Sequence, residues 1–131
     1  MIDVAALVIN YLRLEQQPAF AELPANVGRP CIRVEEAGGP PDASSLMPNR
    51  LTRQDLQLTV WGSSKAEAFD QLDIVLTLLH LAPRLDPVQD AGVIVKFEPI
   101  AGAFYSPDRD WPIEGRPGPR YEQTIRVTAH G

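Results

Sequence analysis

The sequence predicts an α+β domain, a two-layer sandwich with two helices covering one face of a mainly antiparallel sheet of about four to five strands. Two segments carry apolar residues at helical spacing, whereas several others alternate apolar with polar residues, as half-buried strands do. Their order along the chain is helix, strands, helix, strands. Strands from both sides of the second helix can therefore pair in one sheet. With 131 residues, the chain has the usual size of one domain, so we treat residues 1–131 as a single domain.

The first predicted helix begins after Asp3, whose carboxylate can accept hydrogen bonds from the first turn, and it ends before Pro18. Its apolar stripe consists of Val4, Leu7, Val8, Tyr11 and Leu12. This spacing places them on one side of a helix, facing a core.

Two extended pieces and a loop follow. Residues 20–24 predict a short extended piece, and residues 31–36 predict a half-buried strand because Ile32 and Val34 alternate with charged residues. Residues 37–50 are rich in glycine and proline and show neither periodicity. They predict a long loop, which in so small a domain is often functional.

Residues 51–61 form the clearest predicted strand, with Leu56, Leu58 and Val60 on one face and polar residues on the other. After Gly62, the sequence Ser64-Lys65-Ala66-Glu67 predicts a capping box at the start of the second helix. We expect this helix to run to Pro83. Its predicted apolar positions are Phe69, Leu72, Leu76 and Leu79.

The last third of the chain predicts two strands separated by a loop. Residues 91–100 predict a strand with Val93, Val95 and Phe97 on one face. Residues 101–119 are again rich in proline and glycine and predict a second long loop. Residues 121–129 predict the final strand, in which Ile125 and Val127 alternate with polar residues.

Composition disfavours several classes of partner. The formal net charge is −5, which repels phosphate backbones and anionic lipids. The chain has one cysteine, so no internal disulfide can form. The sequence has no secretory signal pattern and no apolar run long enough to span a membrane. We expect the protein to stay in a cytosol-like compartment, or to leave it only as part of something larger.

The sequence also lacks a recognisable catalytic pattern, so we expect a protein that is not an enzyme and has no cofactor or metal. His80 and His130 have no further ligands at a suitable spacing, and nothing near Cys31 would lower the pKa of its thiol. No phosphate-binding or dinucleotide-binding loop is present. Asp108 and Asp110 flank an arginine, which predicts a solvated turn. A loosely bound cation and an interface salt bridge are the alternatives.

Aromatic and arginine residues in the predicted loops are the best candidates for binding, because these residue types are enriched at binding hot spots. Trp61 ends a strand on its polar side, and Trp111 lies in a loop downstream of Phe104 and Tyr105. The alternative is that these aromatic residues pack back on their own sheet. The predicted interface residues are Arg50, Arg53, Trp61, Phe104, Tyr105, Asp108, Arg109, Asp110, Trp111 and Arg116.

With these elements in place, the chain resembles the tail terminator family of long-tailed bacteriophages, in the form common among actinobacterial phages. The resemblance covers nearly the whole chain and depends on the order of its pieces. Those pieces are Met1–Val4 leading into an amphipathic helix, Glu22-Leu23-Pro24, Arg29–Val34 with Gly38-Gly39, Asp55–Gly62, the helix start Ser64–Ala68 and the closing strand Tyr121–Val127.

The resemblance implies a structural virion protein. Such a protein forms a ring, expected to be a hexamer, at the head-proximal end of the tail tube, where it stops polymerisation and joins the tube to head-completion or connector proteins. Its implied location is the head–tail junction of the virion, after assembly in the host cytoplasm. Genomic DNA would pass through the lumen without specific binding, and no membrane is involved.

Three alternatives remain open. The chain could be another neck protein, such as a head-closure or head–tail adaptor, or a subunit like those of the tail tube. It could be a small enzyme or ligand-binding domain that uses a cleft beside residues 101–119. It could also be a toxin–antitoxin or regulatory adaptor. An enzyme would need a concave pocket with convergent polar groups.

Overall fold

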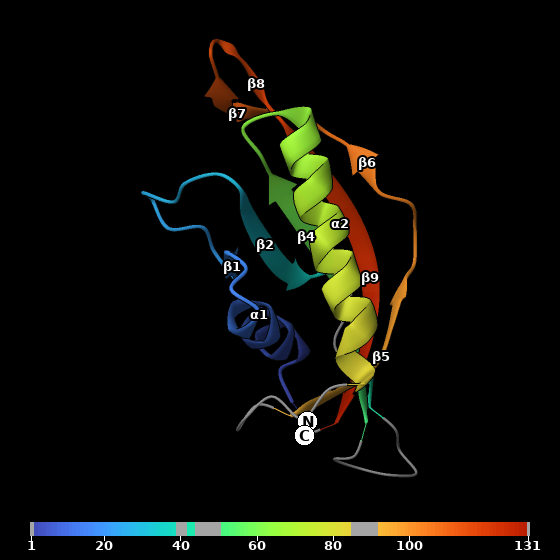
Figure 1. The fold of residues 1–131 in the computed structure, drawn as a ribbon. Coiled ribbons are helices and arrows are strands. Elements are labelled where there is room, and N and C mark those ends of the chain that lie inside the picture. The colour runs from blue at the N-terminus through green and yellow to red at the C-terminus, as the bar shows by residue number, and fades with distance from the viewer. Residues whose placement is uncertain (1, 39–41, 44–50, 85–91, 131) are drawn as a thin grey trace.

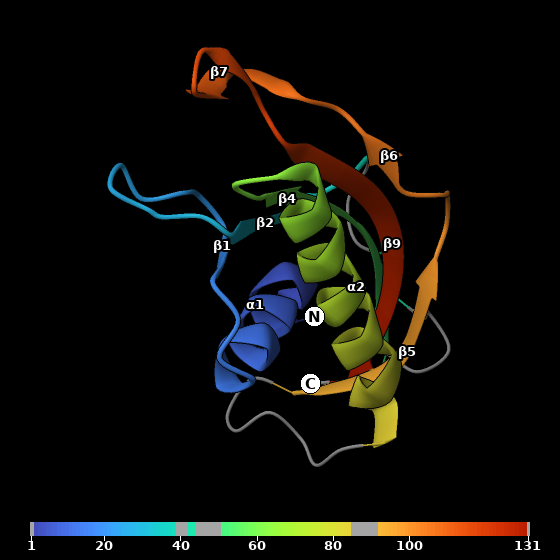
Figure 2. The same ribbon diagram turned by 45° about the horizontal axis from the view of Figure 1, so that its top comes forward.

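The computed structural model describes residues 2–38, 42–43, 51–84 and 92–130. Within these residues, two α-helices lie side by side on one face of a twisted, mainly antiparallel sheet, and the opposite face has no helix (Figures 1 and 2). The predicted α+β two-layer architecture is confirmed.

The main path of the sheet has the strand order β1-β2-β4-β9-β5 among the described residues. Its strands are β1 (Ala19–Phe20), β2 (Cys31–Glu36), β4 (Thr52–Trp61), β9 (Arg120–His130) and β5 (Val93–Pro99). Only β1 and β2 run parallel on this path. Short strands β3 (Asp42–Ala43) and β6 (Phe104–Tyr105) pair with β4 and β9 respectively. The long antiparallel pair β4–β9 therefore forms the centre of the fold.

Both predicted helix starts are confirmed. Helix α1 (Val4–Leu14) is capped by Asp3, whose side chain accepts a hydrogen bond of 3.0 Å from the Ala6 N–H. Helix α2 (Lys65–Leu81) is capped by the Ser64 hydroxyl, which accepts from the Glu67 N–H at 3.1 Å. The Glu67 carboxylate accepts from Ser63 instead of Ser64, one residue earlier than a capping box requires. A short 3₁₀ helix, η1 (Ala82–Arg84), follows α2.

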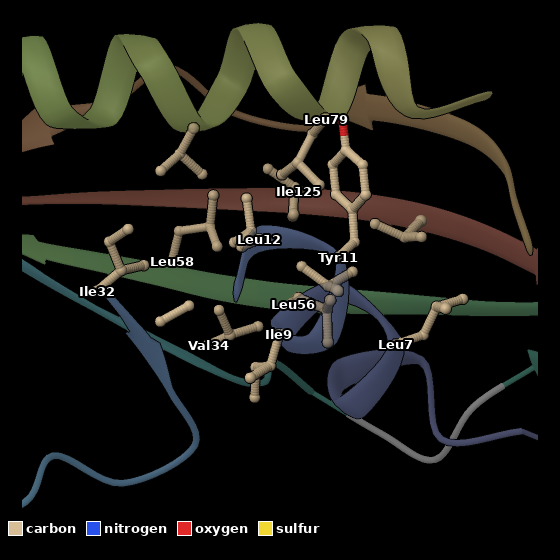
Figure 3. Close-up of a cluster of buried hydrophobic side chains, with 14 of the residues drawn as sticks. Leu7, Ile9, Tyr11, Leu12, Ile32, Val34, Leu56, Leu58, Leu79 and Ile125 are labelled. Atoms are coloured by element: carbon tan, nitrogen blue, oxygen red, sulfur yellow. The ribbon is translucent and has the colours of Figure 1, made fainter. Parts of the chain in front are cut away.

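The core lies between the helices and the sheet (Figure 3). Leu56 and Leu58 of β4 and Ile125 of β9 are fully buried against apolar residues of α1 and α2. The Tyr11 hydroxyl donates a 2.6 Å hydrogen bond to the Leu78 carbonyl and so ties α1 to α2. Burial, and to a lesser extent the charge of Glu15, raises the pKa of Tyr11, so this hydroxyl remains a donor.

Two side-chain placements differ from the sequence prediction. Phe69 of α2 is 53% exposed. The predicted positions Leu72 and Leu79 are buried, and Val75, which was not predicted, is buried with them. In β5, a register shift between Ile94 and Lys96 lies at Val95 and interrupts the alternation. As a result Ile94 is buried, whereas Val95 is 44% exposed.

The prediction of a loop throughout residues 101–119 is wrong. The segment contains β6 and a hairpin of β7 (Asp108–Ile113) and β8 (Arg116–Gly118). The turn residues Glu114 and Gly115 have φ angles of 51° and 75°, which suit a tight two-residue hairpin turn. The prolines are tolerated because the ladder is irregular between its two paired ends and does not require every N–H.

The other predicted loop, residues 37–50, is only partly described. Residues 42–43 form β3, which pairs with Thr52 and Arg53 of β4. Residues 39–41 and 44–50 lie outside the described residues. The loop prediction is therefore wrong for residues 42–43, where a short strand extends the sheet beside the start of β4.

Candidate interaction surface

The predicted interface residues fall into three groups. Trp61, Asp108 and Trp111 meet at the base of the β7–β8 hairpin, which projects from one end of the sheet (Figures 1 and 2). Phe104 and Tyr105 lie on β6. The third group consists of exposed charged residues: Arg53 on β4 and Arg109, Asp110 and Arg116 on the hairpin. Arg50 lies outside the described residues.

Asp108 anchors the hairpin to the end of β4. Its carboxylate accepts a 2.8 Å hydrogen bond from the Trp61 indole N–H and lies 3.5 Å from an Arg120 guanidinium nitrogen. It also accepts from the Asp110 backbone N–H at 2.9 Å. Burial raises the pKa of Asp108, but these two hydrogen bonds and the charges of Arg120 and Arg29 outweigh burial, so its pKa lies below the ordinary value of 3.8. The charged carboxylate is therefore an integral part of the hairpin base.

Two arginines and two tryptophans stack beside this carboxylate. The Arg29 guanidinium carbon lies 3.8 Å from the centre of the Trp111 ring, and Arg29 also donates a hydrogen bond to the Trp111 carbonyl. The rings of Trp111 and Trp61 have centroids 5.9 Å apart, and Arg33 lies over the other tryptophan at 5.3 Å. Cation–π contacts of this kind are stronger when they are partly desolvated. We call the set Arg29, Arg33, Trp61, Asp108, Trp111 and Arg120 the hairpin base.

The hairpin base leaves no room for a side chain at Gly118. A Cβ there would lie 2.2 Å from the Trp111 carbonyl oxygen and 2.6 Å from an Arg29 guanidinium nitrogen. The close approach of the two hairpin strands thus requires glycine.

Trp61 is only 3% exposed. It therefore packs on its own molecule, which is the alternative that the sequence left open.

A second aromatic group lies where β6 meets the start of β9. The rings of Tyr105 and Tyr121 are 5.2 Å apart, and Tyr121 also contacts Phe69 of α2 edge-on at 5.7 Å. Lys65 lies 4.7 Å from the Tyr105 ring. Phe104, the neighbour of Tyr105, points to the opposite side of the strand and is 54% exposed. Phe104 is thus available to a partner, whereas Tyr105 is engaged.

The face of the sheet opposite the helices is polar and charged. The residues there are organised by cross-strand contacts, of which the Asp55–Arg126 pair at 2.8 Å and the Thr124–Gln57 hydrogen bond at 2.8 Å are the best defined. Arg33 and Glu35 form a further ion pair at 3.1 Å. Positive and negative side chains alternate across this face, so it does not present a surface of one sign.

Two open grooves are lined by described residues. One runs along β2 and is lined by the start of α1, residues 21–23 and Arg33–Glu36. Its lining carries four carboxylates and one guanidinium group, that of Arg33. The other groove lies between α2 and β5 and is almost wholly apolar, with Leu76, Leu81 and Phe97 in its lining.

The cysteine and the two histidines considered for chemistry lie on different elements: Cys31 on β2, His80 on α2 and His130 on β9. Burial raises the pKa of the Cys31 thiol to about 11, against the opposing charge of Arg29, so the thiol stays protonated at neutral pH. His80 lines the apolar groove and His130 ends β9. Among the described residues, no three His, Cys, Asp or Glu side chains are placed to hold a metal ion. Neither described helix has the length and apolar character needed to cross a membrane.

Sequence reasoning missed three arginines of the hairpin base: Arg29, Arg33 and Arg120. Arg29 is 82 positions from its hydrogen-bonding partner Trp111. The only signal in the sequence is that these arginines occur just before or within predicted strands. That signal does not identify which arginine meets which ring.

The fold belongs to a known architecture. Comparison with solved structures finds a chain in the "Virion of native gene transfer agent (GTA) particle", with a TM-score of 0.60 and 18% sequence identity. The match covers 98% of this chain and 95% of that chain. No protein-family model and no curated protein matches the sequence. The similarity therefore establishes a shared fold across the full length of both chains.

Proposed function

We propose that this chain is a structural virion protein: a tail terminator that forms a ring on the head-proximal end of a tail tube, stops its polymerisation and joins it to head-completion proteins. The observation that carries this proposal is the full-length fold similarity to a chain of a gene transfer agent virion. The match covers 98% of this chain and 95% of that chain, so the whole fold described here, and not one motif of it, supports the proposal.

The surface of the protein supports a role in assembly. A ring requires two different, complementary surfaces on each subunit, because each copy contacts the next in a head-to-tail manner. This chain has a projecting hairpin at one end of the sheet and open grooves along both of its sides. The hairpin is held by the buried contacts of its base, so it can present its exposed residues in a fixed orientation.

Electron microscopy and native mass spectrometry of the purified protein, with and without tail-tube protein, test the proposal. We expect closed rings, and we expect tubes grown in their presence to be shorter and to carry a ring at one end. Open-ended tubes formed by this chain alone would identify a tube subunit instead. A chain that stays monomeric and leaves tube length unchanged would contradict the proposal.

A further inference from the structure

The hairpin carries two arginines that have no partner within the described part of the chain. Arg109 and Arg116 are exposed and make no ion pair, hydrogen bond or ring contact there. Arg13, Arg29, Arg33, Arg120 and Arg126 all have such contacts, and Arg53 also has one. Among the arginines whose side chains the structure describes, the two unpaired guanidinium groups therefore both lie on the β7–β8 hairpin, which projects from one end of the sheet (Figure 1).

The groove along β2 carries carboxylates that are likewise without a partner. β1 pairs with β2 only at Ile32 and Arg33, so no described strand lies beside Val34–Glu36 on that edge. Asp3, Glu22, Glu35 and Glu36 line the groove. Asp3 caps α1 and Glu35 pairs with Arg33, whereas Glu22 and Glu36 have no partner among the described residues. The groove thus combines a free strand edge with two unpaired carboxylates.

A hairpin cannot fill the groove of its own chain. Cys31 begins β2 opposite Trp61 of the hairpin base, and Glu36 pairs with Leu56, near the other end of the shared ladder. At about 3.3 Å per residue, Glu36 lies roughly 16 Å from the base, and the hairpin points away from it (Figure 1). Contact between the two surfaces therefore requires two molecules.

We propose that the β7–β8 hairpin of one copy docks in the β2 groove of the next, with Arg109 and Arg116 facing Glu22 and Glu36. The hairpin also carries the exposed carboxylates of Asp110 and Glu114, so the match concerns the two arginines and not the charge of the hairpin as a whole. The partner is a second copy of this chain because the same molecule carries both the unpaired arginines and the unpaired glutamates. Arginine suits this role, since its planar group can bind a carboxylate through two hydrogen bonds. The contact is head-to-tail and deepens the proposed ring function, on which it rests.

Charge reversal tests the contact. We expect the double variant R109E/R116E and the double variant E22K/E36K each to weaken self-association at least ~100-fold, because like charges then face each other. K96E and D70K/D73K are matched controls that change exposed charges on β5 and α2, and we expect them to assemble like the wild type. Thermal unfolding of each monomer verifies that the fold is retained.

Mixing the two reversal variants gives a sharper result. In an equimolar mixture, a hairpin with arginines meets an acidic groove at one contact, and a hairpin with glutamates meets a basic groove at the next. We expect rings to return in the mixture, to alternate the two variants and to contain only even numbers of subunits. Native mass spectrometry with a mass label on one variant detects this alternation.

The outcomes separate this contact from the ring itself. Rings that form equally well from both reversal variants overturn the hairpin–groove contact and leave the ring function standing. Loss of rings in the variants without recovery in the mixture also overturns the contact. A wild-type chain that never forms rings, with or without tail-tube protein, overturns both.

Discussion

The two faces of the central strands are stabilised in different ways. On the helix side of β4, Leu56, Leu58 and Val60 are fully buried in the apolar core. On the other side, Asp55 pairs with Arg126, and Gln57 accepts a hydrogen bond from Thr124. Burial of apolar surface depends little on salt and pH, whereas ion pairs depend on both. Adjacent residues of one strand therefore respond to different conditions.

The hairpin base is the exception on the polar face. There Trp61 and Thr59 are as buried as the core residues, although no helix covers them. Arginine, tryptophan and aspartate supply the cover through cation–π contacts and hydrogen bonds. This part of the molecule therefore combines burial with charge, and it should respond both to packing changes and to pH.

Removing apolar volume from the helix side should have the largest effect. Leu58→Ala deletes a fully buried side chain, and we expect it to lower the free energy of unfolding by about 3–4 kcal/mol. Urea unfolding followed by circular dichroism measures the loss. The control is Leu14→Ala at the end of α1, where the side chain is 66% exposed and the change should be below about 0.5 kcal/mol. Equal losses in both variants would contradict the assignment of the core.

A packing change in the hairpin base should have the next largest effect. Gly118→Ala places a Cβ 2.2 Å from the Trp111 carbonyl oxygen, and overpacking of this kind costs about 1–3 kcal/mol. Gly102→Ala is the matched control, because nothing lies within 4 Å of the added Cβ. Hydrogen exchange should accelerate in residues 108–118 for the first variant alone. Unchanged protection there would show that the base tolerates the extra volume.

Sequence patterns predicted those parts of the fold that depend on local periodicity. The stripe of α1, the alternation in β4 and β9 and the caps at Asp3 and Ser64 all depend on residues within a few positions of each other. The bulge at Val95 and the exposure of Phe69 depend on neighbouring strands, so periodicity alone placed these side chains incorrectly. The two-residue turn Glu114-Gly115 was a local signal, but the surrounding prolines favoured a loop.

The hairpin base could be predicted only in part. Trp61, Asp108 and Trp111 were singled out by residue type, because tryptophan and charged residues in Pro/Gly-rich segments suggest contacts. Their arrangement depends on the β4–β9 register, which places Trp61 opposite Arg120. Arg29 joins from before β2, which pairs with the other side of β4. Long-range strand pairing of this kind leaves no spacing in the sequence that would reveal it.

Neutralising the Asp108 carboxylate, which anchors the hairpin, should have a smaller effect on stability, and this effect should depend on pH. Because the pKa of Asp108 lies below 3.8, its charged form stabilises the folded state above that pH, and this contribution is lost as the pH falls through the folded-state pKa. We expect Asp108→Asn to cost about 1–2 kcal/mol at pH 7. The difference in the free energy of unfolding between Asp108→Asn and the wild type should shrink as the pH falls below the ordinary pKa of 3.8. Thermal unfolding of both proteins from pH 7 to pH 2 measures it, and a difference independent of pH would exclude the carboxylate charge as the cause.

Removing the ion pair between Arg126 and Asp55 on the polar face of the sheet should have the smallest effect on stability. Arg126 and Asp55 are each about one-third exposed, and solvent screens such pairs. In a double-mutant cycle with Arg126→Gln and Asp55→Asn, we expect a weak coupling that disappears at ~1 M salt. Asp108→Asn should keep much of its effect at this salt concentration, because its partners Trp61 and the Asp110 backbone N–H are uncharged donors. A coupling between Arg126 and Asp55 that survives high salt would mean that desolvated contacts stabilise the polar face as well as the helix side. The two faces of the sheet would then differ only in degree.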